Sequence, residues 1–149
     1  MIASWIVKRM MRSYFDKINQ DDLDVASATA GMADDCTYEH SSELGVEGVR
    51  KGKKEIAEWF QGWKREFPKR KMVLNDICFS AWPLSPSNVW MIDWSITETS
   101  REGAEFKYDG VMVVHMKNFK MVGGADYISF KGLPKLSTLI KPMGKAQSG

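Results

Sequence analysis

Apolar residues recur every three or four positions in the first half of the chain, which is the spacing of amphipathic helices. Residues 3–20 show this pattern and are expected to form a first helix. The apolar positions that define its face are Ile6, Met10, Tyr14 and Ile18. Asp21 or Asp22 can cap a second, shorter helix that reaches about Ala30. A third helix is expected over residues 52–67, and the proline that follows ends it.

From Lys69 onward the period changes from about 3.6 residues to about 2, as in β-strands. Four consecutive segments rich in Val, Ile, Trp, Tyr and Phe alternate in this way. They are residues 72–82, 88–99, 104–117 and 119–130. Short connections with turn residues join them, so sequential antiparallel strands are expected. Helices followed by a long sheet predict an α+β fold with the helices on one face, where a curved sheet would enclose a pocket.

A shorter alternating segment, Ala33–His40, places a tyrosine and a histidine two residues apart. Positions two apart share one face of a strand, so Tyr38 and His40 are expected to point the same way. Thr37 and Glu39 would point the other way. A tyrosine hydroxyl and an imidazole that converge on one cavity are suited to acid/base chemistry. The alternative for His40 is an exposed histidine at a strand end.

Charge and composition argue against strongly charged partners. The 149 residues carry a net charge of +2, which fits one domain of ordinary size without a strongly basic face for nucleic acid. Residues 131–149 contain four lysines and no acid, which leaves residues 1–130 with a net charge of −2. A domain over residues 1–132 is therefore expected to be followed by a basic, partly ordered extension over residues 133–149.

The two cysteines and the apolar runs bear on the compartment. Cys36 and Cys78 form neither a disulfide framework nor a metal-binding spacing with the two histidines. The order of charges near the start is the reverse of that in a secretory signal. No apolar run is long enough to span a bilayer. A cytoplasmic protein is expected, with no bound metal and with neither a membrane nor a nucleic acid as partner.

Four short motifs resemble the SnoaL-like branch of the nuclear-transport-factor-2-like superfamily. They are Tyr14–Asp24, Ala33–Tyr38, Gly52–Trp59 and Asp126–Tyr127. The resemblance covers about residues 5–130 and implies a cone-shaped α+β fold, with about three helices over a curved, mostly antiparallel sheet. The superfamily includes polyketide cyclases, ketosteroid isomerase and limonene epoxide hydrolase. Because this fold hosts unrelated reactions and also non-enzymes, the resemblance does not by itself define a reaction.

The resemblance transfers site residues only in part. Tyr14 lies where ketosteroid isomerases keep the tyrosine that stabilises an enolate oxygen, and His40 occupies the position of their carboxylate base. Met112 stands where those isomerases and the polyketide cyclases keep an acid. Limonene epoxide hydrolases use an Arg-x-Asp motif and a further Asp, and the corresponding positions here are Asp93–Ser95 and Asp126. None of the three mechanisms transfers intact.

The candidate catalytic residues form an acid/base set. His40 would act as general base, since imidazole titrates near neutral pH. Asp93 lies in an otherwise apolar strand, and if it faces the same cavity as Asp126, their repulsion would raise one pKa. Tyr14 and Tyr38 would donate hydrogen bonds to a developing oxyanion. The alternative for Asp93 is that backbone amides or a tryptophan N–H donate hydrogen bonds to its carboxylate. The alternative for Tyr14 is a core aromatic residue.

The expected function is proton transfer on a small, largely apolar substrate by an isomerase, cyclase, dehydratase or epoxide hydrolase without a cofactor. A non-catalytic protein that holds a small molecule in the same cavity is the alternative. Aromatic and methionine side chains would form an apolar, adaptable wall. The residues expected to contact the substrate are Trp59, Trp63, Ser95, Tyr108 and Met112.

The strand over residues 88–99 also predicts a homodimer. Its two faces are Trp90, Ile92, Trp94 and Ile96 on one side and Val89, Met91, Asp93 and Ser95 on the other. If the Asp93 face lines the cavity, the tryptophan face needs another cover, and the sheet of a second subunit is the expected one. The alternative cover is the C-terminal extension, folded back over the sheet.

Overall fold

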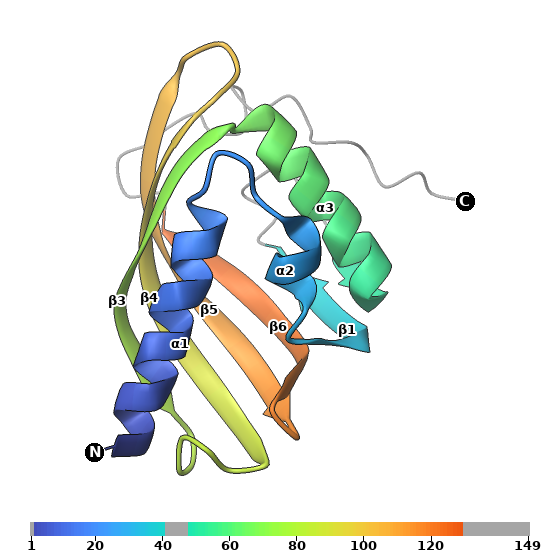
Figure 1. Ribbon diagram of the computed structural model, residues 1–149, viewed down its shortest axis with the longest axis vertical. Coiled ribbons are helices and arrows are strands. Elements are labelled where there is room, and N and C mark those ends of the chain that lie inside the picture. Colours follow the sequence, from blue (N-terminus) through green and yellow to red (C-terminus); the bar gives the residue numbers. More distant parts are fainter. Residues whose placement is uncertain (1, 41–47, 130–149) are drawn as a thin grey trace.

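A curled six-stranded sheet organises the fold. The computed structural model describes residues 2–40 and 48–129 (Figure 1). The strands are β1 (Met32–Glu39), β2 (Val49–Lys51), β3 (Lys69–Phe79), β4 (Ser87–Thr99), β5 (Glu105–Lys117) and β6 (Lys120–Ser129). They lie in the order β2-β1-β6-β5-β4-β3, and neighbours are antiparallel except β1 and β6, which are parallel. The expected α+β fold with a mostly antiparallel sheet is confirmed.

Three helices cover one face of this sheet (Figure 1). They are α1 (Ile2–Ile18), α2 (Val25–Thr29) and α3 (Gly52–Glu66). Helix α1 packs along β3 and α3 packs along β1. Their apolar stripes supply fully buried side chains such as Val7, Phe15 and Ile56, as the helical spacing in the sequence predicted.

Polar side chains fix the position of α1 and the start of α2. The side chain of Asn19, just after α1, donates to Met72 O (2.8 Å) and accepts from Met72 N (2.6 Å), which ties the end of the helix to β3. Asp24 Oδ1 accepts from Ala26 N at 3.1 Å and caps α2. The predicted cap at Asp21 or Asp22 is wrong, because residues 19–24 form a turn and the helix begins at Val25.

The two faces of β4 are the reverse of the sequence expectation. Trp90, Ile92, Trp94 and Ile96 are all buried under the helices, whereas Asp93 is exposed and Ser95 half-buried on the outer face. Alternation shows which residues share a face but not which face the helices cover. Burial of the tryptophans and isoleucines removes far more apolar area from water, so that face forms the core. The argument for a homodimer from an outer tryptophan face is therefore wrong, and the homodimer itself stays a prediction.

Two further expectations concern the ends and the membrane. The predicted C-terminal extension, residues 133–149, lies outside the described residues. Within the part of the chain that the structure describes, none of the helices has the length and apolar character needed to cross a bilayer.

Candidate active site

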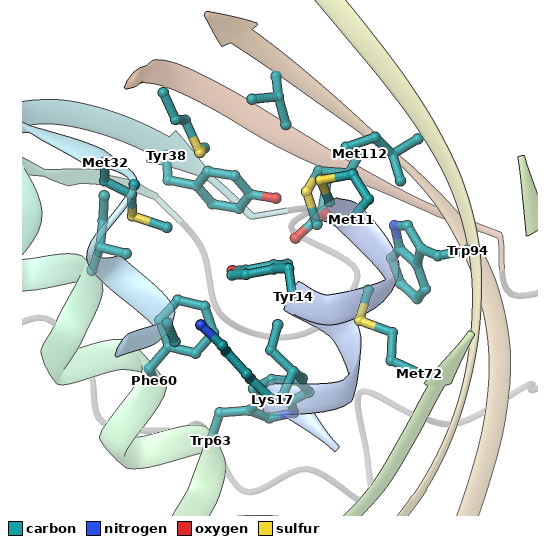
Figure 2. A pocket seen from close by; sticks show the side chains of 18 of the residues that line it. Met11, Tyr14, Lys17, Met32, Tyr38, Phe60, Trp63, Met72, Trp94 and Met112 are labelled. Atoms are coloured by element: carbon teal, nitrogen blue, oxygen red, sulfur yellow. The ribbon is translucent and has the colours of Figure 1, made fainter. Parts of the chain in front are cut away.

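A cavity of about 370 Å³ lies between the helices and the inner face of the sheet. Its volume falls at the low end of the range of small-molecule sites, about 300–1,000 Å³. Figure 2 shows aromatic and methionine side chains around it, including Phe60 and Trp63 from α3 and Trp94 from β4. The walls are mainly apolar, so the few polar groups that line the cavity determine its chemistry.

Asp126 brings a carboxyl group into this apolar cavity from β6. Its Oδ1 atom is buried and has no hydrogen-bond partner among the described residues. Burial raises the pKa of Asp126 from 3.8 to about 7, although the nearby Tyr38 hydroxyl opposes part of the rise. A carboxyl group with this pKa exchanges its proton near neutral pH, as a general acid or base must.

Tyr38 lies beside Asp126 because β1 and β6 are paired in parallel. In this register Tyr38 is opposite Gly124. A Cβ atom on Gly124 would lie 2.9 Å from Cε2 of Tyr38, so only glycine leaves room for the ring against β6. The Tyr38 hydroxyl is close enough to influence Asp126, but it does not reach hydrogen-bond geometry with any described residue. It is therefore a donor with no acceptor among the residues that the structure describes.

Tyr14 enters the same cavity from α1, opposite Tyr38 (Figure 2). Burial, with a smaller contribution from the charge of Asp126, raises the pKa of the Tyr14 phenol well above 10. The pKa of Tyr38 is raised for the same two reasons, again with burial first. Both phenols keep their protons at physiological pH and can serve as hydrogen-bond donors to an oxygen placed near Asp126.

His40 directly follows β1 and lines the cavity together with Tyr38, as predicted, and both side chains are buried. Its ring stacks on Trp59 with centroids 3.9 Å apart and meets the edge of Tyr38 at 4.9 Å. Burial, followed by the charge of Arg50, lowers the pKa of His40 from 6.5 to about 3. The imidazole is therefore neutral at physiological pH and is a weak base. Its role as general base stays a prediction, and the pKa favours Asp126 for that role.

A second polar cluster, centred on Glu98, was missed by the sequence reasoning. Glu98 is 2% exposed, and its two oxygens accept from Tyr108 Oη (2.6 Å) and Trp63 Nε1 (2.9 Å). Burial raises the pKa of Glu98, while these hydrogen bonds and the charge of Arg70 oppose the rise. Glu98 lies on the same face of β4 as Trp94 and Ile96, because residues two apart along a strand share a face. Its burial could therefore have been predicted from the sequence if the inner face of β4 had been chosen correctly.

The cavity gathers eight of the ten residues predicted for the site. They are Tyr14, Tyr38, His40, Trp59, Trp63, Tyr108, Met112 and Asp126. Asp93 and Ser95 lie on the outer face, where Asn75 Nδ2 donates to both, at 3.2 and 2.7 Å. Their placement in the cavity was wrong for the reason given for β4, and Asp93 therefore cannot form a facing pair with Asp126. The roles of the other eight in binding or catalysis remain predictions.

The sequence profile of the SnoaL-like domain matches residues 11–123, which is more than half of the chain. This chain belongs to the SnoaL-like family. The matched range contains all of the predicted site residues except Asp126. No curated protein sequence matches the chain.

Solved structures similar to this SnoaL-like protein share its fold, and several of them are described as nuclear-transport-factor-2-like proteins. A superfamily member from Salmonella enterica serovar Typhimurium str. LT2 is 16% identical with a TM-score of 0.67, over 90% of this chain and 96% of that one. TerC co-crystallised with polyporic acid is 16% identical with a TM-score of 0.64, over 80% and 88% of the two chains. A protein with a ketosteroid-isomerase-like fold from Catenulispora acidiphila DSM 44928, in complex with trimethylamine, is 11% identical with a TM-score of 0.66, over 80% and 85%. At these identities the similarity shows the fold alone.

The described residues of this SnoaL-like protein do not form a metal-binding cluster. Within residues 2–40 and 48–129, no group of three or more His, Cys, Asp or Glu side chains is arranged to hold a metal ion. The polar side chains that line the cavity carry the carboxyl, phenol, imidazole and indole groups described above, together with the Lys17 ammonium and the Ser27 hydroxyl.

Proposed function

We propose that this SnoaL-like protein is an enzyme that moves a proton on a small, largely apolar substrate with a carbonyl or enol oxygen, without a cofactor. The observation that carries the proposal is the buried carboxyl group of Asp126, with a pKa of about 7, beside the phenols of Tyr14 and Tyr38 in an apolar cavity. An isomerase, a cyclase or a dehydratase would use this chemistry.

Asp126, Tyr14 and Tyr38 each have a defined part in the proposed reaction. The Asp126 carboxylate removes a proton from a carbon next to the substrate carbonyl, and the electron pair of the C–H bond moves into the carbonyl group. The resulting enolate oxygen accepts hydrogen bonds from Tyr14 and Tyr38. Protonated Asp126 then returns the proton to a different carbon of the conjugated system. General acid/base groups contribute about 10²- to 10⁴-fold and one oxyanion donor about 10²- to 10³-fold.

Two features support a ring-containing, oxygenated substrate. The indole N–H groups of Trp59, Trp90 and Trp94 are buried and lack acceptors among the described residues, although all three tryptophans line the cavity. Indole N–H groups only donate, so a ligand with several oxygen acceptors would satisfy them. The ligand co-crystallised with the structurally similar TerC is polyporic acid.

The test is exchange of α-protons of β-tetralone and cyclohexenone in deuterium oxide, followed by proton NMR. We expect the protein to accelerate exchange, with a rate that rises with pH and levels off above about 7 as Asp126 ionises. Asp126→Asn should lose the acceleration, and Tyr38→Phe should lower it by about 10²-fold. Asp93→Asn, on the outer face, is the matched control. Acceleration that survives in Asp126→Asn would contradict the proposal.

The alternative is a non-catalytic protein that holds a ligand in the same cavity. The unpartnered indole donors favour it as much as they favour an enzyme. The two are separated by comparing exchange with binding, which quenching of tryptophan fluorescence by β-tetralone reports. Tight binding to the wild type without any acceleration of exchange supports the binding protein.

A further inference from the structure

The cavity opens to solvent beside α1. Most residues that line it are buried, but Met10, Lys17, Ala30, Gly31 and Phe119 line it and are exposed. They come from α1, from the connection between α2 and β1, and from the β5–β6 turn. The mouth of the cavity therefore lies where these three elements meet.

Met10 and Phe119 at the mouth belong to a set of five large apolar side chains that are exposed. They are Ile2 (78%), Trp5 (56%), Met10 (55%), Trp82 (62%) and Phe119 (65%). The start of α1, the β3–β4 connection and the β5–β6 turn are all at the lower end of the molecule in Figure 1. The last two are joined directly, since Asn118 N donates to Pro86 O at 2.6 Å. We call these five side chains the open rim.

Trp82 is presented outward by a loop whose backbone is held in place. Asn88, buried at the start of β4, donates from Nδ2 to Trp82 O at 2.8 Å and accepts at Oδ1 from Ser80 Oγ at 3.1 Å. Ser85 N also donates to Trp82 O, at 2.8 Å. The exposure of this indole is thus a property of a hydrogen-bonded loop, and it leaves most of a large apolar side chain in contact with solvent.

Phe119 occupies a position that glycine would fill with less strain. Asn118 (φ 49°) and Phe119 (φ 62°) form the two-residue turn between β5 and β6, and both adopt left-handed backbone conformations. Asn-Gly is the preferred pair in such hairpin turns, and a bulky residue at positive φ carries a cost. The turn therefore keeps an exposed aromatic ring at the mouth of the cavity at the expense of stability.

Basic side chains surround the open rim. The first three turns of α1 contain Lys8, Arg9 and Arg12 and no acid, and the β5–β6 turn is flanked by Lys117 and Lys120. Arg9 lies over the Trp5 ring at 5.4 Å. Asp76, at the same end, pairs with Lys8 at 3.0 Å. The end that carries the exposed aromatic rings is therefore also cationic.

We propose that the open rim docks on the surface of an anionic lipid membrane and takes up the apolar ligand from it. Exposed tryptophan and phenylalanine with flanking Lys and Arg are the composition of interfacial membrane-binding surfaces. Each basic side chain that reaches an anionic surface strengthens partition by about fivefold. Met10 and Phe119 belong both to the open rim and to the mouth of the apolar cavity, so a membrane-dissolved ligand enters from the docked surface without crossing water. This departs from the sequence expectation of no membrane partner, and it does not depend on the chemistry proposed for Asp126.

The test is co-sedimentation of the full chain with vesicles of phosphatidylcholine, with or without about one-third phosphatidylglycerol. We expect binding to the anionic vesicles that weakens as salt is raised, since salt screens exposed charges. Trp82→Ser with Phe119→Gly should lower partition by about tenfold or more. Lys117→Glu with Lys120→Glu should lower partition onto anionic vesicles relative to the wild type, and this loss should be larger at low salt than at high salt. Met91→Ser with Tyr127→Ser, which removes exposed apolar groups of the outer face, is the control and should bind as the wild type does.

The Phe119→Gly change also excludes misfolding as the cause of weaker binding. Glycine suits the turn, so this single variant should melt at the same temperature as the wild type or higher while it binds vesicles less well. Absence of binding to anionic vesicles at low salt, or equal binding by the rim variants, would overturn the proposal. So would a wild-type dimer that the rim variants convert to monomers by light scattering, because the rim would then be a protein interface.

Discussion

Replacement of Asp126 by asparagine should change how the stability of the protein depends on pH. The folded protein holds the Asp126 proton with a pKa of about 7, against 3.8 for an ordinary aspartate. This difference of about three pKa units corresponds to about 4 kcal/mol. Because the folded pKa is raised, the wild type loses this free energy of unfolding as pH rises from about 4 to about 7. Asparagine has no proton to lose, so the variant keeps it.

Most of the effect lies in a convenient pH range. Between about pH 5 and pH 8 the wild type should lose about 2–3 kcal/mol relative to Asp126→Asn. The figure is an upper limit, because Asp126 keeps some accessible surface and water in the cavity would lower the cost of ionisation. Urea unfolding followed by tryptophan fluorescence at several pH values measures the difference directly.

The control is Asp93→Asn, which removes an exposed carboxyl group from the outer face of the sheet. Its free energy of unfolding should differ from that of the wild type by a nearly constant amount over the same pH range. If Asp126→Asn also runs parallel to the wild type, Asp126 is not a buried carboxyl group of raised pKa. The proposed general base would then have lost its physical basis.

Three other variants test the rest of the site. Glu98→Ala should destabilise the protein by about 2–4 kcal/mol, because two buried donors lose their acceptor, and Glu98→Gln should recover part of the loss in urea unfolding. Gly110→Ala should cost about 1–3 kcal/mol in thermal melting, since its Cβ atom would clash with the Trp94 ring. Gly31→Ala, whose Cβ atom would have nothing within 4 Å, should be nearly neutral in the same assay. His40→Ala should slow β-tetralone exchange more than His115→Ala does. In His40→Gln the exchange rate should still show its pH inflection near 7. If that inflection disappears, it belongs to His40 instead of Asp126.

The sequence predicted the elements well because their signals are local. The spacing of apolar residues in α3, the alternation in β4 and β5, and the glycine-containing turns each act over a few residues, and the helix predicted over residues 52–67 is observed as Gly52–Glu66. The shared face of Tyr38 and His40 followed from strand geometry alone. Family resemblance added the cone shape and the place of Tyr14.

The errors arose where the answer depends on tertiary packing. Alternation along β4 is consistent with either face as the inner one. The aspartate in an otherwise apolar strand was interpreted as a cavity residue, which led to the wrong choice. The same choice hid Glu98, which shares its face with Trp94. The weak basicity of His40 could not be read from its type, because it arises from burial and from the charge of Arg50. These properties require the sheet to be assembled first.

The parallel pairing of β1 with β6 has a consequence for how the protein folds. Tyr38 and Asp126 are 88 residues apart in the chain, and β6 is the last described strand yet lies in the sheet between β1 and β5. During synthesis, the edges of β1 and β5 that face β6 therefore stay unpaired until β6 has been made and inserts between them. Such non-local pairing is slow, and open edges favour aggregation. We expect refolding yield to fall as protein concentration rises, and the ligand cavity to close only in the final folding step.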